Sequence, residues 1–523
     1  MLRKYFLSFF LLLPFCAQAG NVQFLDPNFK AFCVVRYDQN LDGEISFQEA
    51  ASETGSFNCT GAGLTDLTGI EAFVNIPFLA YGTNQLTSLP DISTLTKLEE
   101  FYCWQNQLTS LPDLSNLTLL RRLGVSHNPL GQLPDLSNLH NLESLDCQQN
   151  QLTSLPNLPS PSNLKSFNCS ENLITELPNL SAHTNLEALN VSVNQLQSLP
   201  SLSSLVNLQD LQVQANQLTS LPSLLNLTNL TKLDCHFNVL TALPAMTSQT
   251  LLREFFCWRN QLTALPNLDS LINLERFDCS DNLITHLPSL AALDRLGEFY
   301  CDNNPLGDLP DLSGLTNLLA FSCRGSQLSS LPPLNALTNL VLLDLSNNNL
   351  TALPDLSTLK ELESLRLSNN QFVAVPNLTG LTNLLGLFLD SNQITQLNGL
   401  EPVTSLRILN IGFNRITSLP NLLNFHNIFN LNCERNLLTS IQPVLGLSNL
   451  QNFDCEGNLL DVDDCPDILT LESRIGPFDY TLQGYFDPDE FLLALPSWLE
   501  TPDFLQDWVY MASNLQFDLV CAP

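Results

Sequence analysis

Hydrophobic positions return every 22 residues through most of this 523-residue chain. Counting in steps of 22 from Asn84 to Asn458, asparagine occupies 17 of 18 positions, and Ser326 is the exception. Around each asparagine the chain follows L-x-x-[LF]-x-[LVC]-x-x-N-x-[LI]. Alternate residues of a strand point to the same face, so this alternation predicts one short β-strand in every repeat.

A second regularity follows each strand, where most repeats carry Leu-Pro or Val-Pro, as at Pro90, Pro112, Pro376 and Pro420. Proline fixes φ and has no N–H to donate, so this segment is not the middle of a helix. We expect extended backbone and short 3₁₀ turns there. The repeated asparagine leaves the strand at a turn, where its amide both donates to and accepts from neighbouring backbone groups. Stacked repeats would therefore form a solenoid whose buried polar groups are satisfied by the asparagines.

The 22-residue consensus resembles the leucine-rich repeat, and its L-T-x-L-P-x-L-x-x-L-T-N-L form resembles exported bacterial proteins of the internalin-like group. The resemblance implies an α/β solenoid, a leucine-rich repeat horseshoe or superhelix with parallel strands on the concave face. Its convex segments are expected to be extended or 3₁₀, with caps at both ends. The resemblance also implies a binding role rather than a chemical one.

Four segments are predicted along the chain. In residues 1–19, Arg3 and Lys4 precede the apolar run Tyr5–Phe15, and Ala17-Gln18-Ala19 has the small residues of a signal peptidase site. We expect cleavage after Ala19 and a secreted, periplasmic or cell-surface protein without a transmembrane segment. Residues 20–56 are predicted to form an EF-hand-like N-terminal cap, 57–460 the repeat array, and 461–523 a C-terminal cap with apolar residues at helical spacing.

Cysteine recurs three residues before the repeated asparagine, in the same slot as valine, leucine and isoleucine. A slot shared by these residue types is hydrophobic, so we expect the thiols to lie in the core as free thiols. Disulfides between neighbouring strands are the alternative, and metal-binding or nucleophilic roles are less favoured. The slot cysteines are Cys59, Cys103, Cys147, Cys169, Cys235, Cys257, Cys279, Cys301, Cys323, Cys433 and Cys455.

Three cysteines of the expected mature chain fall outside this phase: Cys33, Cys465 and Cys521. The last two bracket the C-terminal segment. Capping segments of exported repeat proteins often require covalent closure, so Cys465 and Cys521 are the candidate disulfide. Cys33 is either free or paired with Cys59, and the sequence does not choose between them.

The stretch DQNLDGEISFQE matches the twelve-residue calcium loop of an EF-hand. Its preceding segment, DPNFKAFCVVRY, is expected to form the entering helix. A single hand lacks the usual partner hand, so its expected role is to stiffen the N-terminal cap. The alternative is an acidic surface loop that binds nothing. The predicted ligands are Asp38, Asn40, Asp42, the carbonyl of Glu44, Ser46 and a bidentate Glu49.

Charge and motifs narrow the classes of function. The formal net charge is −32, which disfavours nucleic acid and anionic lipid as partners. The sequence contains no H-E-x-x-H, G-x-S-x-G, P-loop or C-x-x-C motif, and its six histidines are dispersed. We therefore expect a non-enzymatic, monomeric protein whose only cofactor is calcium.

The concave strand face is the expected binding surface, because its outward positions are mostly small or polar and a few are large. Trp, Tyr and Arg dominate binding hot spots, which makes these few residues candidates for a protein or glycan ligand. A structural or assembly role at the bacterial exterior, with the array as a spacer, is the alternative function. The candidates form three groups: Tyr102 and Trp104; His236, Phe237, Phe256, Trp258, Arg259, Tyr300, Asp302 and Arg324; and Phe388 with Phe413.

Overall fold

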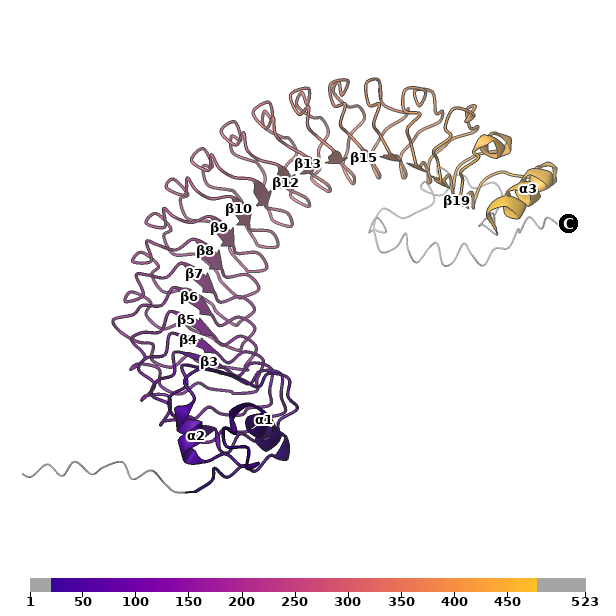
Figure 1. The fold of residues 1–523 in the computed structure, drawn as a ribbon. Helices are drawn as coiled ribbons and strands as arrows, with labels where there is room; N and C mark the ends of the chain where they lie inside the picture. Colours follow the sequence, from indigo (N-terminus) through magenta and orange to yellow (C-terminus); the bar gives the residue numbers. More distant parts are fainter. Residues whose placement is uncertain (1–19, 477–523) are drawn as a thin grey trace, which may run out of the picture. The chain divides into compact units, whose positions relative to one another are not determined.

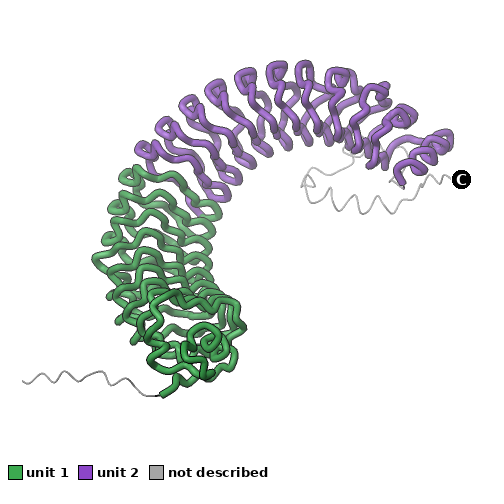
Figure 2. The backbone as a smooth tube through the Cα atoms, viewed as in Figure 1, with its two compact units in different colours: residues 1–238 green, residues 239–523 purple. Residues whose placement is uncertain are grey.

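A computed structural model of the chain describes residues 20–476. The chain divides into two compact units, Met1–Asn238 and Val239–Pro523, and each is described here by itself (Figure 2). The predicted signal peptide, residues 1–19, lies outside the described residues, as do Cys521 and the chain beyond residue 476. The predictions made for those segments, and the predicted domain boundaries, stay predictions.

Unit 1 begins with a helical cap. Helix α1 (Pro27–Tyr37) confirms the predicted entering helix, and the Asp26 side chain caps it by accepting from the N–H groups of Asn28 and Phe29. Helix α2 (Phe47–Ser52) follows the loop. Aromatic rings close the cap over the first strand, with Phe57 packed edge-on against Phe73 at 4.9 Å between centroids. Such a cap covers the apolar end that an uncapped repeat would expose.

Both units contain one three-residue parallel strand per repeat (Figure 1). Paired residues on neighbouring strands are 22 positions apart, as for Phe57 with Leu79 and Phe255 with Phe277. The predicted strands and their parallel stacking are therefore confirmed. Unit 1 holds β1 (Ser56–Asn58), β2 (Phe78–Ala80), β3 (Glu100–Tyr102), β4 (Arg122–Gly124), β5 (Ser144–Asp146), β6 (Ser166–Asn168), β7 (Ala188–Asn190), β8 (Asp210–Gln212) and β9 (Lys232–Asp234). Unit 2 holds β10 (Glu254–Phe256), β11 (Arg276–Asp278), β12 (Glu298–Tyr300), β13 (Ala320–Ser322), β14 (Leu342–Asp344), β15 (Ser364–Arg366), β16 (Gly386–Phe388), β17 (Ile408–Asn410), β18 (Asn430–Asn432) and β19 (Asn452–Asp454).

The return path is built mainly from single turns. In a typical repeat, Leu95 N–H donates to the Ile92 carbonyl and Leu98 N–H donates to the Leu95 carbonyl, each at 3.0 Å. These are i→i+3 bonds, the hydrogen-bond type of a 3₁₀ helix. Within residues 20–476, 3₁₀ helices form only at η1 (Ile70–Ala72), η2 (Gln442–Gly446) and η3 (Val462–Asp464). In unit 2 the strands lie on the inner side of the bend and the turns on the outer side (Figure 1).

The interior of each unit is filled by leucine, phenylalanine and cysteine. In unit 2, Phe255, Phe277, Phe299 and Phe321 stack face to face, with centroids 5.2 to 5.6 Å apart. The eleven slot cysteines are buried and form no disulfide, as expected for core thiols. Cys33 forms no disulfide with Cys59, so of the two predicted alternatives the structure has the free thiol. The slot is hydrophobic, as its mixed occupancy predicts, and burial raises the pKa of Cys103 to about 12.

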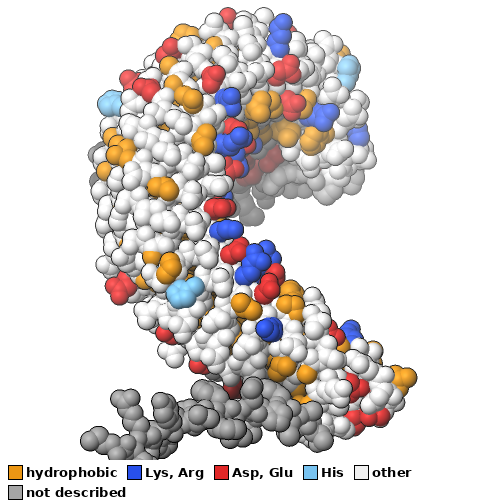
Figure 3. All heavy atoms as spheres, turned by 60° about the vertical axis from the view of Figure 1, so that its left-hand side comes forward, with side chains coloured by type: hydrophobic (Ala, Val, Ile, Leu, Met, Phe, Trp, Pro, Cys, Tyr) orange, Lys and Arg blue, Asp and Glu red, His pale blue; other side chains and the backbone are white. Residues whose placement is uncertain are grey.

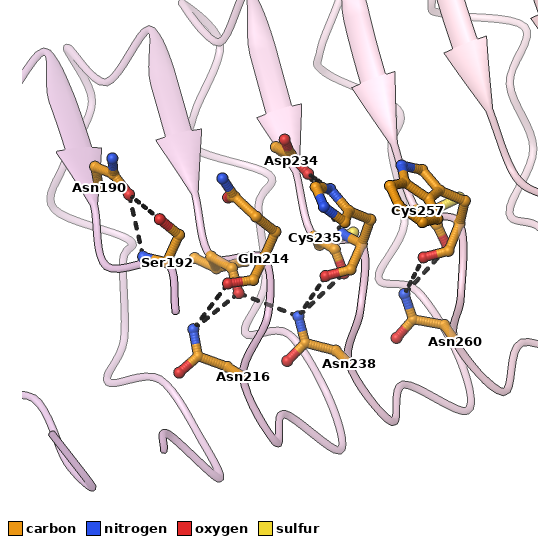
Figure 4. A network of polar contacts seen from close by, with 12 residues as sticks. Asn190, Ser192, Gln214, Asn216, Asp234, Cys235, Asn238, Cys257 and Asn260 are labelled. Atoms are coloured by element: carbon orange, nitrogen blue, oxygen red, sulfur yellow. Dashed lines mark hydrogen bonds and ion pairs between the residues drawn. The ribbon is translucent and has the colours of Figure 1, made fainter. Parts of the chain in front are cut away.

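The repeated asparagines form a buried polar ladder next to the cysteines (Figure 4). In unit 1, the Asn172 Nδ2 group donates to the carbonyls of Cys147, Cys169 and Ser170, each at 3.0 Å. Its Oδ1 accepts from the Leu152 N–H at 2.9 Å. One side chain thus satisfies backbone groups of its own repeat and of the preceding one, which is the role predicted for it.

Beyond the last strand, α3 (Cys465–Ile475) packs against η2 with Ile468 and Leu471 buried. Arg474 Nη1 donates to the Leu445 carbonyl at 3.0 Å. Cys465 is disulfide-bonded, and its partner lies outside the described residues. The pairing with Cys521 therefore stays a prediction. Within residues 20–476, no helix has the length and apolar character needed to cross a bilayer.

Candidate functional site

The acidic loop between α1 and α2 has a tightly turned backbone. Leu41 and Gly43 adopt positive φ angles of 62° and 83°. Asp38 holds the loop closed, because its Oδ1 accepts from Leu41 N–H at 2.7 Å and its Oδ2 from Gly43 N–H at 2.8 Å. Glycine at the sixth loop position permits this bend, where a side chain would be strained. The backbone is thus shaped around the predicted ligands.

Glu49 is buried and ties the end of the loop to its beginning. Its Oε2 accepts from the Ser46 N–H and hydroxyl, each at 2.8 Å, and its Oε1 from the Gln39 N–H at 3.0 Å. These bonds lower the pKa of the Glu49 carboxyl, and the bonds from Ser46 have the largest effect.

A chain segment before α1 pairs with the second half of the loop. The Val22 N–H donates to the Ile45 carbonyl at 2.7 Å, and Asn21 forms an antiparallel bridge with Ser46. Within the described chain, no three His, Cys, Asp or Glu side chains form an arrangement that could hold a metal ion. The predicted set nevertheless consists of oxygen donors alone: Asp38, Asn40, Asp42, the Glu44 carbonyl, Ser46 and Glu49. Oxygen donors are those that calcium requires.

The first predicted aromatic group lies on strand β3 and the turn after it. The Trp104 ring covers the backbone of Gly82, where a Cβ atom would lie only 2.5 Å from the ring. The Tyr102 ring covers Gly124 in the same way, at 2.7 Å. Both rings are half-buried, and Gly82 and Gly124 occupy the same positions one repeat earlier and one repeat later. Each ring therefore rests on a glycine that leaves room for it.

Hydrogen bonds hold this aromatic group further in place. The Tyr102 hydroxyl donates to Glu100 Oε2 at 2.9 Å, and Arg122 Nη1 donates to Glu100 Oε1 at 2.9 Å. The Phe78 ring lies 5.6 Å from the Tyr102 ring. The sequence prediction did not include Phe78, Glu100 and Arg122. These residues are 22 positions apart, so they occupy the same position in successive repeats, and this spacing could have identified them as neighbours.

The second predicted group is divided between the two units. In unit 1, His236 Nδ1 lies 2.5 Å from Asp234 Oδ1, and Phe237 is 42% exposed in the turn after β9 rather than on the strand. In unit 2, the Arg276 guanidinium lies over the Phe256 ring at 5.5 Å, and the Arg259 guanidinium over the Trp258 ring at 5.5 Å. These are cation–π distances.

Three further residues of the second group are all in unit 2. Asp302 Oδ1 accepts from the Ser322 hydroxyl at 2.5 Å and from the Arg324 N–H at 2.7 Å. Burial is the largest cause that raises the pKa of the Asp302 carboxyl. Burial also raises the pKa of Tyr300, followed by the charge of Glu298. The Arg324 side chain is exposed on the strand face.

The third group pairs each phenylalanine with an arginine one repeat away. Arg366 lies over the Phe388 ring at 5.1 Å, and Arg435 lies over the Phe413 ring at 5.3 Å. Phe413 occupies the turn after β17 with φ 51° and is 42% exposed. The sequence prediction did not include Arg366 and Arg435, although both lie 22 residues from their rings.

The comparisons with known proteins agree with this architecture. The structure is similar to YopM from Yersinia enterocolitica WA-314, with 28% identity and a TM-score of 0.67 over 82% of this chain and 91% of YopM. The chain has the leucine-rich repeat fold.

Two more distant solved structures share this leucine-rich repeat fold. The functional domain of InlJ from Listeria monocytogenes, described as including a cysteine ladder, has 24% identity and a TM-score of 0.55 over 83% of this chain and 82% of that one. The plant peptide hormone receptor RGFR1 in complex with RGF2 has 24% identity and a TM-score of 0.53 over 76% and 73%. No protein-family model and no curated protein sequence matches the chain.

Proposed function

We propose that this protein is an exported, non-enzymatic recognition protein that holds a protein or glycan partner on the strand face of its leucine-rich repeats. The observation that carries the proposal is the aromatic group of Tyr102 and Trp104. Both rings are fixed against glycine backbone, so little side-chain entropy is lost when a partner covers them. Rigid, partly exposed Tyr and Trp side chains are typical of binding hot spots.

Two further observations support a protein partner. The RGFR1 structure holds its peptide hormone RGF2, which shows that this fold serves peptide recognition in a relative of similar architecture. The strand face of unit 2 also carries arginines held over aromatic rings at 5.1 to 5.5 Å. Each pair stacks a planar guanidinium on a ring, and Arg276 and Arg435 are also ion-paired with Glu298 and Glu456, so these side chains are held in place before a partner arrives.

The test is capture of partners from the exterior fraction of the source cell or its surroundings, followed by affinity measurement with the captured partner. Replacing Trp104 with alanine is expected to weaken binding about 30-fold, because truncating a hot-spot tryptophan costs about 2 kcal/mol or more. Leu119→Ala is the matched control, since Leu119 is an exposed apolar residue on the turn side of unit 1. Equal binding by both variants would contradict recognition at this group and favour the spacer role.

We also propose that the loop from Asp38 to Glu49 binds calcium and thereby stabilises the N-terminal cap. The oxygen-only donor set and the two positive φ angles of the loop support this proposal. Bound calcium would cross-link the end of α1 to the start of α2, and α2 itself contacts η1 beside the first strands. Weak extracellular sites bind with Kd values of about 10⁻⁴ to 10⁻³ M, so millimolar calcium is the relevant concentration.

Removing calcium with a chelator is expected to lower the unfolding temperature of the cap by several degrees. At a calcium concentration of about ten times Kd, binding to the folded state adds about 1.4 kcal/mol. Glu49→Gln should abolish the difference between calcium and chelator, whereas Glu53→Gln, just past α2, should retain it. Differential scanning calorimetry of the three proteins, with and without calcium, provides the measurement. An unfolding temperature that chelation leaves unchanged in the parent protein would refute the role.

A further inference from the structure

One row of residues precedes the strands, outside the strand face, and its basic members pair by a simple rule. The row consists of the residue immediately before each strand, and its members are 22 positions apart. In unit 1, Arg121 Nη2 lies 2.8 Å from Glu143 Oε1, and Lys165 Nζ lies 3.1 Å from Glu143 Oε2. In unit 2, Arg253 Nη1 lies 2.9 Å from Glu275 Oε1. Each of these cations therefore has a carboxylate one repeat away.

The same association of charges is visible on the surface, where Lys and Arg side chains lie mainly beside Asp and Glu side chains (Figure 3). The chain has 52 acidic and only 20 basic residues, so carboxylates greatly outnumber cations. Elsewhere in the described chain, basic side chains such as Lys97 and Lys360 form no ion pair, so the rule concerns this row.

Arg407 departs from the rule. Its row neighbours, one repeat before and one after, are Leu385 and Phe429. Among the residues that the structure describes, no carboxylate lies within ion-pair distance of the Arg407 guanidinium. Arg407 is exposed, so its charge and its donors face solvent. Because a guanidinium presents a planar fork of donors, it is suited to bind a carboxylate through two parallel hydrogen bonds.

Arg407 also lines a shallow hollow that is open to solvent. The hollow has a volume of about 410 Å³ and is lined by Arg407, Asn427, Phe429, Asn449 and Gln451, at the beginning of β17, β18 and β19. This volume falls in the range of small-molecule sites. Asn449 uses its Nδ2 group on the His426 carbonyl at 2.6 Å, which leaves its Oδ1 as an acceptor. The side-chain amides of Asn427 and Gln451 have no hydrogen-bond partner within residues 20–476.

We infer that this hollow binds an acidic sugar residue, with the Arg407 guanidinium on its carboxylate. The three amide side chains supply both donors and acceptors, which is what neighbouring sugar hydroxyls require. The half-buried Phe429 ring offers an apolar face to the C–H groups of a pyranose ring. A carboxylate alone would use only Arg407, whereas an acidic sugar uses every side chain that lines the hollow. This site is separate from the strand face, so it does not depend on the partner proposed above.

The experiment uses the full chain and D-glucuronate as the probe, with D-glucose and acetate as comparison ligands. Ligand-observed saturation-transfer NMR gives ring contacts, and a titration gives Kd. We expect glucuronate to bind at least about tenfold more tightly than glucose or acetate, and Arg407→Gln to remove that preference. Phe429→Leu should weaken saturation of the sugar ring protons and leave folding intact, because Leu385 and Leu319 already occupy this row position.

Two controls make the outcome decisive. Arg253→Gln removes an arginine of the same row that is already paired with Glu275, so glucuronate binding should be unchanged. Trp104→Ala should also leave it unchanged, which separates this site from the strand face. Equal affinities for glucuronate and acetate, or for glucuronate and glucose, would overturn the inference. Binding that survives Arg407→Gln would overturn it as well.

Discussion

Raising the pH from 8 to 11 is expected to unfold the protein sharply, because its buried thiols resist ionisation only while it is folded. Burial is the largest cause that raises the pKa of Cys59 and of Cys103 to about 12. It also raises the pKa of Cys33, Cys147, Cys169, Cys235, Cys279, Cys301 and Cys433. In an unfolded chain a cysteine thiol has a pKa of about 8.5.

The sign of the effect follows from the direction of these shifts. A pKa that is raised in the folded state contributes stability that is fully present below the unfolded pKa and is lost as the pH rises toward the folded pKa. The window for Cys59 and Cys103 is therefore from about pH 8.5 to about 12. Within it each thiol lowers the free energy of unfolding by about 1.4 kcal/mol per pH unit.

Unit 1 is expected to unfold within this window. Six of these thiols lie in unit 1, so its free energy of unfolding falls by about 8 kcal/mol per pH unit, whereas domains are typically stable by about 5–15 kcal/mol. Far-UV circular dichroism during a pH titration under argon measures the transition. Thiolate absorbance should rise at the same pH as the loss of ellipticity, since the thiols ionise on unfolding.

A variant with Cys147, Cys169 and Cys235 replaced by valine provides the control. Valine already fills the same slot at Val125, Val191 and Val213, each fully buried, so stability at pH 7 should change little. The alkaline midpoint of unit 1 should move upward, because three of its titrating groups are gone. An unchanged midpoint, or thiolate absorbance that appears while the ellipticity persists, would contradict this explanation.

Most of the repeat architecture could be predicted because one local pattern recurs with a constant period. Any slot that holds Cys, Val and Leu in different repeats has to be buried, and all of these side chains are. The constant spacing also determines the register, since residues 22 apart pair throughout each unit. The contacts of the N-terminal cap could not be predicted in this way. The bridge from Asn21 to Ser46 joins segments that occur only once, so no repetition reveals their pairing.

The candidate site was only partly predictable from sequence. Aromatic residues such as Trp104 stand out against the small residues of the strand face, but their packing depends on the neighbouring repeats. Gly82 lies under Trp104, and Arg366 lies over Phe388, in each case 22 residues away. Comparing each residue with those 22 positions before and after it would have identified both contacts. The placement of Phe237 and Phe413 in turns required the structure, because it depends on their left-handed backbone angles.

Replacing Asn282 with alanine is expected to destabilise unit 2 by about 3–5 kcal/mol. Its Nδ2 group donates to the carbonyls of Cys257, Cys279 and Ser280 at 3.0, 3.0 and 3.1 Å, and its Oδ1 accepts from the Leu262 N–H at 3.0 Å. The side chain is 5% exposed, so water does not replace these bonds. Each buried backbone group left without a partner costs about 1–3 kcal/mol.

The matched control is Asn273→Ala, which removes a half-buried asparagine whose solvent-exposed hydrogen bond goes to one carbonyl, that of Thr250, at 2.7 Å. Its cost should stay below about 1 kcal/mol, because the freed carbonyl reaches water. Unfolding of a solenoid is not strictly two-state, so hydrogen exchange of amides near β10–β12 is the suitable measurement. Equal losses of protection in the two variants would show that the asparagine ladder is not what stabilises the repeats.

An intermediate replacement tests the ladder further, because the chain contains one natural exception. Ser326 occupies the asparagine position with only a hydroxyl donor, which lies 3.3 Å from the carbonyls of Cys301 and Arg324. Asn282→Ser should therefore lose less stability than Asn282→Ala. Asn282→Asp should lose more at pH 7, because a carboxylate would face three carbonyl oxygens, and should recover as the pH falls and the side chain is protonated. This order of stability, serine above alanine above aspartate at neutral pH, follows only if the donated hydrogen bonds are the source of the stabilisation.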